Sequence, residues 1–314
     1  MVKAEQTAGM AQSTRQQQVT TLARAESPPA DRSGLKNALM IVAIIAILLI
    51  LWEGAKWFAA INNYAIALGP LHIDLTLFNN TQLPHLADII ASLGEPAQRN
   101  GPPLWQMLLE SVAFTFYSAF LGFVFGGVFG FALAVLFAHV SSLQRGMMPF
   151  VVASQTVPIL AIAPMVVVWM GRVGNVTMAV PLIAAYLTFF PVTIYTLRGL
   201  TSMPPTALEL MQTYAATTRE IFFKLRLPNA LPHIFTALKL ASTASIVGAI
   251  IGELPSGIQT GLGIAILNFS RYYNQSPSRL WASILVAGLA GILFFALIAL
   301  IERLVVRWRP VESK

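Results

Sequence analysis

Apolar residues in this chain are gathered into continuous runs of about 20 residues, the length at which an α-helix crosses a hydrocarbon core about 30 Å thick. Shorter polar segments separate the runs. The runs are continuous and do not alternate, which favours helices over the short strands of a membrane barrel. We therefore predict an all-α, polytopic helical membrane protein. The six predicted transmembrane helices cover residues 39–61, 111–138, 147–170, 177–198, 233–253 and 281–302.

The composition agrees with a chain that lies mostly in a membrane. Hydrophobic residues make up 56% of the 314 residues, charged residues make up 11%, and the mean hydropathy is +0.69. A soluble domain of this length would carry about 25% charged residues. The absence of cysteine excludes disulfides, thiolate metal sites and cysteine nucleophiles. The net charge of +7 is spread over loops and termini, so it indicates membrane topology and not nucleic-acid binding.

Basic residues are distributed unequally between the two sides of the predicted helices. With the N-terminus inside, fourteen of the 20 Lys and Arg residues lie in inner segments, and Lys56 and Lys239 lie within spans. Inner loops of membrane proteins are enriched in Lys and Arg, so both termini are expected to be cytoplasmic. The polar segment 199–232 then also faces the cytoplasm. The four outer basic residues are Arg99, Arg172, Arg271 and Arg279.

The N-terminal part of the chain divides into a tail and an anchor. Residues 1–36 are polar and lack an apolar period, so we predict a disordered cytoplasmic tail. Residues 37–62 are predicted to form a retained transmembrane anchor, because this run is too long and too far from the N-terminus for a cleaved signal peptide. Residues 304–314 are predicted to form a second cytoplasmic tail.

Two outer segments are long for simple connectors. The segment 63–104 is expected to begin with a short interfacial helix and to become irregular at its proline-rich end. The segment 254–280 mixes apolar residues with Gly257, Gly261 and Gly263, which favours a re-entrant or interfacial element.

Small residues and prolines shape the predicted spans. Gly122, Gly126 and Gly130 follow one another at intervals of four, so they form a flat stripe that another helix can approach closely. The stripe serves either packing within one subunit or a subunit interface.

The third and fourth spans contain several prolines, which kink helices and favour an arrangement around a pathway. These prolines are Pro149, Pro158, Pro164, Pro181 and Pro191.

Polar residues at membrane depth are the candidates for lining a translocation pathway. Hydrogen bonds between helices explain such residues equally well. For the single carboxylate among them, the alternatives are a gate, a loop contact or a solvated helix end. In the first span, Glu53 and Lys56 lie three residues apart and can neutralise each other. The pathway candidates are Gln155, Thr156, Ser242, Ser245 and Glu253.

The polar segment 199–232 has the periodicity of amphipathic helices. Thr206 with Glu209 three positions later matches a capping box, and two short helices are expected to meet near residues 216–218. Two Leu-Pro pairs, in the sequence LPNALP at 227–232, are expected to end the element and turn the chain into the fifth span. A partner protein could hold this element, or it could lie on the lipid surface.

The same segment resembles the permease subunits of binding-protein-dependent ABC importers. The family signature runs E-A-A, three residues, Gly, and then two hydrophobic-Pro pairs. Here Glu209, Leu210 and Met211 stand for E-A-A, Ala215 stands for Gly, and Leu227, Pro228, Leu231 and Pro232 supply the two pairs. If the family turn needs a positive φ, Ala215 is expected to bend another way, at a cost of about 1 kcal/mol or more.

The resemblance covers residues 105–303, and it implies the type I ABC importer permease fold with 199–232 as the coupling loop. It implies a second permease copy, two cytoplasmic ATPase subunits that bind ATP and Mg, and an extracytoplasmic solute-binding protein, in a bacterial inner membrane. No glycine here precedes a lysine, so the chain lacks the phosphate loop of an ATPase. The branch it resembles imports pyrimidine or thiamine precursors and riboflavin, or nitrate, sulfonates and taurine.

Two other classes of function are weighed against this one. An ATP-independent secondary transporter or channel would need no ATPase, although no chain of carboxylates threads the predicted spans. A membrane-embedded enzyme would need a catalytic cluster, and the four histidines are scattered over loops and span ends without metal-ligand spacing. These histidines are His72, His85, His139 and His233.

Overall fold

The computed structural model describes residues 33–68, 71–98 and 101–306, and the predicted tails 1–36 and 304–314 lie almost wholly outside them. The described residues form two compact units, which divide between Phe78 and Asn79. In the first unit, helix α2 (Ser33–Ile61) contains the first apolar run, and the hairpin of β1 (Ala65–Leu68) and β2 (Leu71–Asp74) follows it. The strands are antiparallel, with Ala65 opposite Asp74. A 3-10 turn, η1 (Thr76–Phe78), closes the unit.

The hairpin corrects the expectation of an interfacial helix at the start of the segment 63–104. The sequence of β2 alternates apolar and polar residues, Leu71, His72, Ile73 and Asp74, which is the period of a strand and not of a helix. Asn63 and Tyr64 adopt positive φ just before β1, so the chain reverses there instead of continuing α2.

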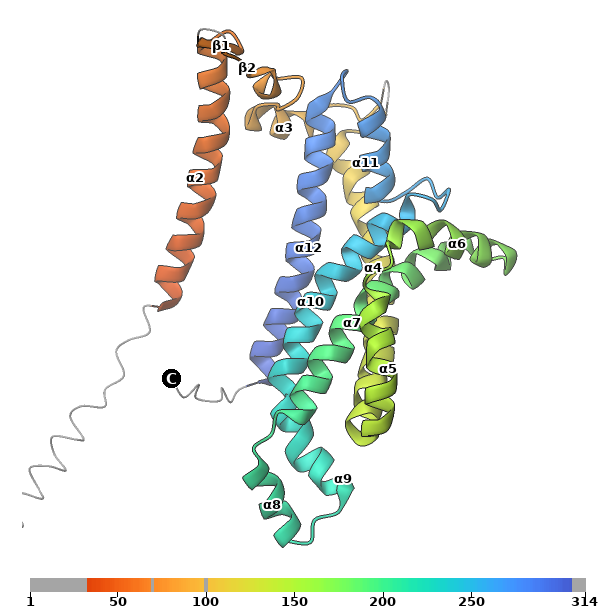
Figure 1. Ribbon diagram of the computed structural model, residues 1–314. Helices are drawn as coiled ribbons and strands as arrows, with labels where there is room; N and C mark the ends of the chain where they lie inside the picture. Colours follow the sequence, from red (N-terminus) through yellow and green to blue (C-terminus); the bar gives the residue numbers. More distant parts are fainter. Residues whose placement is uncertain (1–32, 69–70, 99–100, 307–314) are drawn as a thin grey trace, which may run out of the picture. The chain divides into compact units, whose positions relative to one another are not determined.

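The second unit is a bundle of long helices with short elements at both ends (Figure 1). Its helices follow from the long apolar runs, and its short elements come from the polar segments between them. The elements are α3 (Leu86–Ser92), α4 (Leu104–His139), α5 (Ser141–Ser154), α6 (Ile159–Arg172), η2 (Val176–Met178), α7 (Ala179–Thr201), α8 (Pro205–Thr213), α9 (Thr218–Ile221), η3 (Phe222–Arg226, a π-helical turn), α10 (Leu227–Glu253), α11 (Leu262–Arg271) and α12 (Pro277–Val305).

Small residues bring the central helices of the bundle together. A Cβ on Gly126 would lie 2.4 Å from the Ala185 carbonyl oxygen, so only glycine permits this approach of α4 to α7. Gly122 and Gly130 face α7 in the same way, and all three are buried. The predicted stripe therefore packs within the subunit, which is one of its two interpretations. Gly248 likewise brings α10 against Ala184 of α7.

The fold class is confirmed as a helical membrane protein, with one difference in the spans. Among the described residues, five helices are long and apolar enough to cross a membrane. The third span, predicted as a single helix over 147–170, is instead the pair α5 and α6, bent by 96°. Pro158 follows the break, and it has no N–H to continue a helix and disfavours helical backbone at Val157. The Tyr186 hydroxyl donates to the Ser154 carbonyl oxygen freed there.

Candidate functional site

The polar segment between α7 and α10 folds into what we call the α8–α9 element, residues 205–226. It projects from one end of the bundle, and α3 and α11 lie at the opposite end, the α11 end (Figure 1). The two short helices were predicted to meet near 216–218, and α8 ends at Thr213 while α9 begins at Thr218. The element therefore consists of two helical pieces joined by a tight turn.

The turn between α8 and α9 is built on Ala215 in the left-handed region, with φ +52°. The Ala215 N–H donates to the Gln212 oxygen at 2.8 Å, and the Ala216 N–H donates to the Met211 oxygen at 3.0 Å. This pair of bonds is a Schellman motif, which usually has glycine at the left-handed position. The expectation that Ala215 bends another way was wrong, because the two bonds to the end of α8 hold the alanine in the conformation that glycine prefers.

A capping box starts α9, and it lies elsewhere than predicted. The Glu220 N–H donates to the Thr217 hydroxyl, and the Glu220 carboxylate accepts from the Thr217 N–H. The predicted box of Thr206 with Glu209 is absent, since α8 begins at Pro205 and Thr206 already lies inside the helix. The Lys224 ammonium reaches Glu220 at 2.9 Å, one turn further along.

The two Leu-Pro pairs continue the helix, contrary to the expectation that they end the element. Pro228 lies in the first turn of α10 and Pro232 lies inside α10. The π-helical turn η3 precedes Pro228, and such a turn accommodates a residue that cannot donate a backbone hydrogen bond. The predicted spans included 233–253, whereas the helical stretch runs from Thr218 to Glu253. The α8–α9 element is thus joined to the bundle through an unbroken helix.

Contacts at the base of the element attach it to α4 and α7. The Arg226 guanidinium donates to the Ala138 oxygen at the end of α4, at 3.3 Å. The rings of His139 and Phe222 lie 5.3 Å apart. Gly199 at the end of α7 packs on the start of α10, where a Cβ would lie 2.7 Å from that of His233. The base is therefore fixed to three long helices.

The far side of the element is left open to solvent in this chain. Leu210 is 58% exposed and Tyr214 is 78% exposed, and Glu209 beside them is also exposed. Met211 is half-buried. Exposed apolar side chains next to a carboxylate on a short helix form a surface suited to a protein partner.

The structure separates the predicted pathway residues into three places. Gln155 and Thr156 lie at the break between α5 and α6, both exposed. Ser242 and Ser245 are buried within α10, and each hydroxyl donates to a carbonyl oxygen of its own helix. Glu253 lies at the end of α10 that is nearest α11. Their assignment to a pathway stays a prediction.

Glu253 is fully buried and bonded to two other helices. Its Oε1 accepts from the Thr115 hydroxyl of α4 at 2.6 Å, and its Oε2 accepts from the Gly263 N–H of α11 at 2.6 Å. The Thr115 hydroxyl in turn accepts from the Leu262 N–H at 2.9 Å. The sequence did not point to Thr115, because a single threonine in an apolar run gives no signal of a partner that lies 138 residues away.

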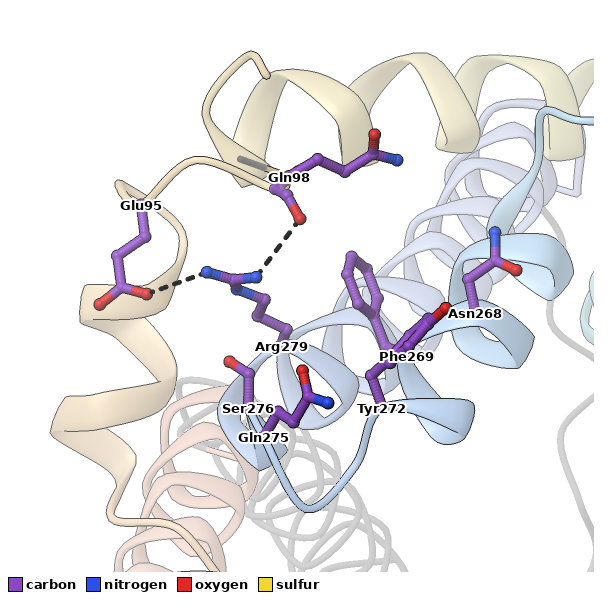
Figure 2. A pocket seen from close by; sticks show the side chains of 9 residues that line it. Glu95, Gln98, Asn268, Phe269, Tyr272, Gln275, Ser276 and Arg279 are labelled. Carbon is purple, nitrogen blue, oxygen red and sulfur yellow. Dashed lines mark hydrogen bonds and ion pairs between the residues drawn. The ribbon is translucent and has the colours of Figure 1, made fainter. Parts of the chain in front are cut away.

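A pocket of about 720 Å³ opens at the α11 end between the connection from α3 to α4 and the segment from α11 to α12. Figure 2 shows Arg279 reaching across it, with its guanidinium 3.6 Å from the Glu95 carboxylate. The same guanidinium donates to the Ala97 oxygen at 3.4 Å. The side chains that line this pocket are mostly polar or aromatic. The lining residues are Glu95, Ala97, Gln98, Asn268, Phe269, Tyr272, Gln275, Ser276 and Arg279.

These features define a membrane transport subunit: apolar helices that span a bilayer, a projecting helical element at one end and a polar pocket at the other. Residues 122–308 match the family model described as binding-protein-dependent transport system inner membrane component, and the chain belongs to this family. The predicted membership and the role of translocation subunit in an ABC importer are thereby confirmed. The chain is accordingly a transport subunit.

Several relatives show which transport systems the chain is similar to. It is 35% identical over 210 residues to the formylaminopyrimidine transport permease protein ThiX of Halalkalibacterium halodurans, covering 65% of this chain and 82% of the relative. It is 30% identical over 205 residues to the riboflavin transport system permease protein RibX of Chloroflexus aurantiacus, covering 65% and 73%. It is 29% identical over 206 residues to the taurine transport system permease protein TauC of Escherichia coli, covering 65% and 68%.

Proposed function

We propose that this permease imports a small organic solute and takes its energy from separate ATPase subunits that bind the α8–α9 element. The observation that carries the proposal is the exposed surface of Glu209, Leu210 and Tyr214 on an element continuous with α10. An apolar surface of this kind on the inner side needs a partner to cover it. ATP and Mg would be held by that partner, since this chain has no phosphate loop.

The geometry supports a division of roles within the element. Glu209, Leu210 and Met211 would contact the ATPase, and the Ala215 turn would set the angle between α8 and α9. Leu227, Pro228, Leu231 and Pro232 belong to the first turns of α10, so a displacement of α9 would pass through them into the bundle. Closure of two ATPase subunits on ATP would then move α10 and switch the pathway between inward- and outward-open states.

The remaining partners follow from the family and the orientation of the chain. A second permease copy, in a homodimer, would complete the pathway, and a solute-binding protein would dock at the α11 end on the outer side. The excess of basic residues on the inner side supports a bacterial inner-membrane protein with both termini in the cytoplasm. For the solute we favour a pyrimidine or thiamine precursor or a riboflavin-like compound, because those relatives are 35% and 30% identical, ahead of a sulfonate, nitrate or taurine.

Charge reversal on α8 tests the ATPase contact. The permease is co-expressed with the ATPase and binding protein encoded beside it, and Glu209→Lys is compared with Glu110→Lys, the same change at an exposed position of α4 near the α11 end. We expect Glu209→Lys, and more so Glu209→Lys with Leu210→Asp, to lose both the co-purifying ATPase and ATP-dependent uptake. Glu110→Lys should keep both.

The outcome that overturns the proposal is equally direct. Uptake that continues after deletion of the ATPase gene, or that resists vanadate, would assign the chain to the ATP-independent transporters or channels. Retention of the ATPase by the double variant would show that the surface on α8 is not the contact. The ligand that co-purifies with the neighbouring binding protein identifies the solute class.

A further inference from the structure

Glu253 performs the task of a helix cap for α11, although it belongs to another helix. The first N–H groups of any helix lack partners within it, and a side chain at the N-cap position usually supplies an acceptor. The N-cap of α11 is Gly261, which has no side chain. The Glu253 carboxylate and the Thr115 hydroxyl accept the N–H groups of Gly263 and Leu262 instead. The start of α11 is therefore held by α10 and α4 together.

Two glycines, Gly261 and Gly263, let the backbone at the start of α11 lie close to the Glu253 carboxylate. Gly261 has φ +133°, and a Cβ there would lie 2.4 Å from the Glu253 carboxyl carbon. A Cβ on Gly263 would lie 2.4 Å from the Ile250 oxygen and 3.0 Å from Glu253 Oε2. The backbone of α11 thus lies directly against the last turn of α10.

The two ends of α10 have different neighbours. Its first turn follows the α8–α9 element without a break, and its last residue is Glu253. From Glu253 the contact passes to α11, whose far half lines the α11-end pocket with Asn268 and Phe269. An unbroken series of helices and contacts therefore runs from the projecting element at one end of the bundle to the pocket at the other.

We propose that Glu253 is a positioning residue that couples α10 to α11, so that a displacement entering α10 at the α8–α9 element moves α11 and changes the shape of the α11-end pocket. The inference rests on the proposed function, which supplies the displacement. It replaces the interpretation of Glu253 as a pathway residue, because both carboxylate oxygens already accept bonds inside the fold and the side chain is 0% exposed.

The absence of cysteine allows a direct test in the full complex of permease, ATPase and binding protein in lipid. Two single-cysteine variants are labelled with a membrane-impermeant maleimide reagent, and the rate of labelling is measured. Asn268→Cys, labelled from the outer side, reports on the pocket. Tyr214→Cys, labelled from the inner side, reports on the ATPase contact. In the otherwise unaltered chain, we expect vanadate-trapped nucleotide to change the Asn268→Cys rate severalfold. Glu253→Ala or Thr115→Val is then added to each cysteine variant. The Asn268→Cys labelling rate should no longer change with nucleotide, and Tyr214→Cys should still be shielded by the ATPase.

Conservative variants separate positioning from general damage. Thr115→Ser keeps the hydroxyl and should restore the nucleotide-dependent labelling, whereas Thr115→Val has nearly the same volume and should not. Glu110→Ala, at an exposed position near the same end, should leave the change intact.

Three outcomes have distinct meanings. If Asn268→Cys labelling still responds to nucleotide when Glu253 is alanine, the coupling role is overturned. If labelling responds normally but the KM for uptake rises, Glu253 contacts the solute and the inference is likewise overturned. If Tyr214→Cys is not shielded in the unaltered chain, the proposed ATPase contact itself fails, which is distinguishable because it does not involve Glu253.

Discussion

The two ends of the bundle are stabilised in different ways. In α8, the turn and α9 the stabilising bonds join residues at most five positions apart, such as the Schellman bond from Ala216 to Met211 and the pair of Lys224 with Glu220. The long-range bond from Arg226 to Ala138 lies at the base of the element. At the α11 end the bonds around Glu253 and Thr115 are buried and join residues up to 147 positions apart. A surface element made of local bonds keeps its shape without being buried, so it stays available to a partner. The α11 end takes its shape from the long helices and must follow them.

This comparison teaches where a substitution should act. Damage to α8 or to the turn after it should stay local, because the bonds there join residues at most five positions apart. Damage at the α11 end should lower the stability of the whole second unit, because its bonds hold together α4, α10 and α11. The four predictions below follow from this difference.

The largest effect is expected from Gly261→Ala. The new Cβ would meet the Glu253 carboxyl group at 2.4 Å in a backbone conformation that alanine rarely adopts. Overpacking and backbone strain together should cost about 3 kcal/mol or more, seen as a large drop in the thermal unfolding midpoint of the purified protein. Gly257→Ala is the matched control, because Gly257 also has positive φ but open space around its Cβ position. An equal loss in both variants would show that the clash is unimportant.

Thr115→Val should cost about 2 kcal/mol in the free energy of unfolding. The substitution keeps the volume but leaves the buried Glu253 Oε1 and the Leu262 N–H without their partner. Denaturant titration in detergent measures the loss. Thr243→Val provides the comparison, since the Thr243 hydroxyl bonds only the Leu240 oxygen of its own helix and its loss should be smaller. A loss at Thr243 as large as at Thr115 would argue against the special role of the α11 contact.

Thr217→Ala should cost about 1 kcal/mol, and only locally, because it removes the side-chain cap of α9. We expect faster amide hydrogen exchange in residues 214–226 and unchanged exchange in α4 and α7. Thr218→Ala, one residue further on, removes no N-cap and should change exchange little. Faster exchange throughout the bundle would contradict the local character of the element.

The smallest change in stability, and the only increase, is expected from Ala215→Gly. Glycine adopts the positive φ of this position without the strain that alanine bears, which should stabilise the turn by up to about 1 kcal/mol. Slower exchange of the Ala215 and Ala216 amides would register it. At Ala216, where φ is not positive, the same change to glycine should weaken the turn. If both variants destabilised the turn, the positive φ at Ala215 would not be a source of strain.

The helical class and the number of apolar runs could be predicted from the sequence, because hydropathy over about 20 residues depends on the lipid and hardly on tertiary contacts. The glycine stripe and the two-helix form of the α8–α9 element were also readable from local spacing. The family could be recognised for the same reason, since its motif lies in one continuous segment.

The remaining features depend on contacts between distant residues. The carboxylate of Glu253 was recognised, but its partners on α4 and α11 were not, because pairing across the fold leaves no local pattern. The Leu-Pro pairs resembled helix ends, yet the π-helical turn before Pro228 lets the helix continue. The start of α8 was placed two residues late, since Pro204 is the N-cap and Thr206 already lies in the first turn.

The unbroken helix from Thr218 to Glu253 has 36 residues, which corresponds to a rod about 54 Å long. Because a bilayer's apolar interior measures about 30 Å, roughly 24 Å of this rod extends beyond the lipid tails. A tilt of about 10° around its midpoint would move each tip by about 5 Å, in opposite directions, a simple consequence of its length. Modest rotation on the inner side is thus enough to produce a displacement of molecular size on the outer side.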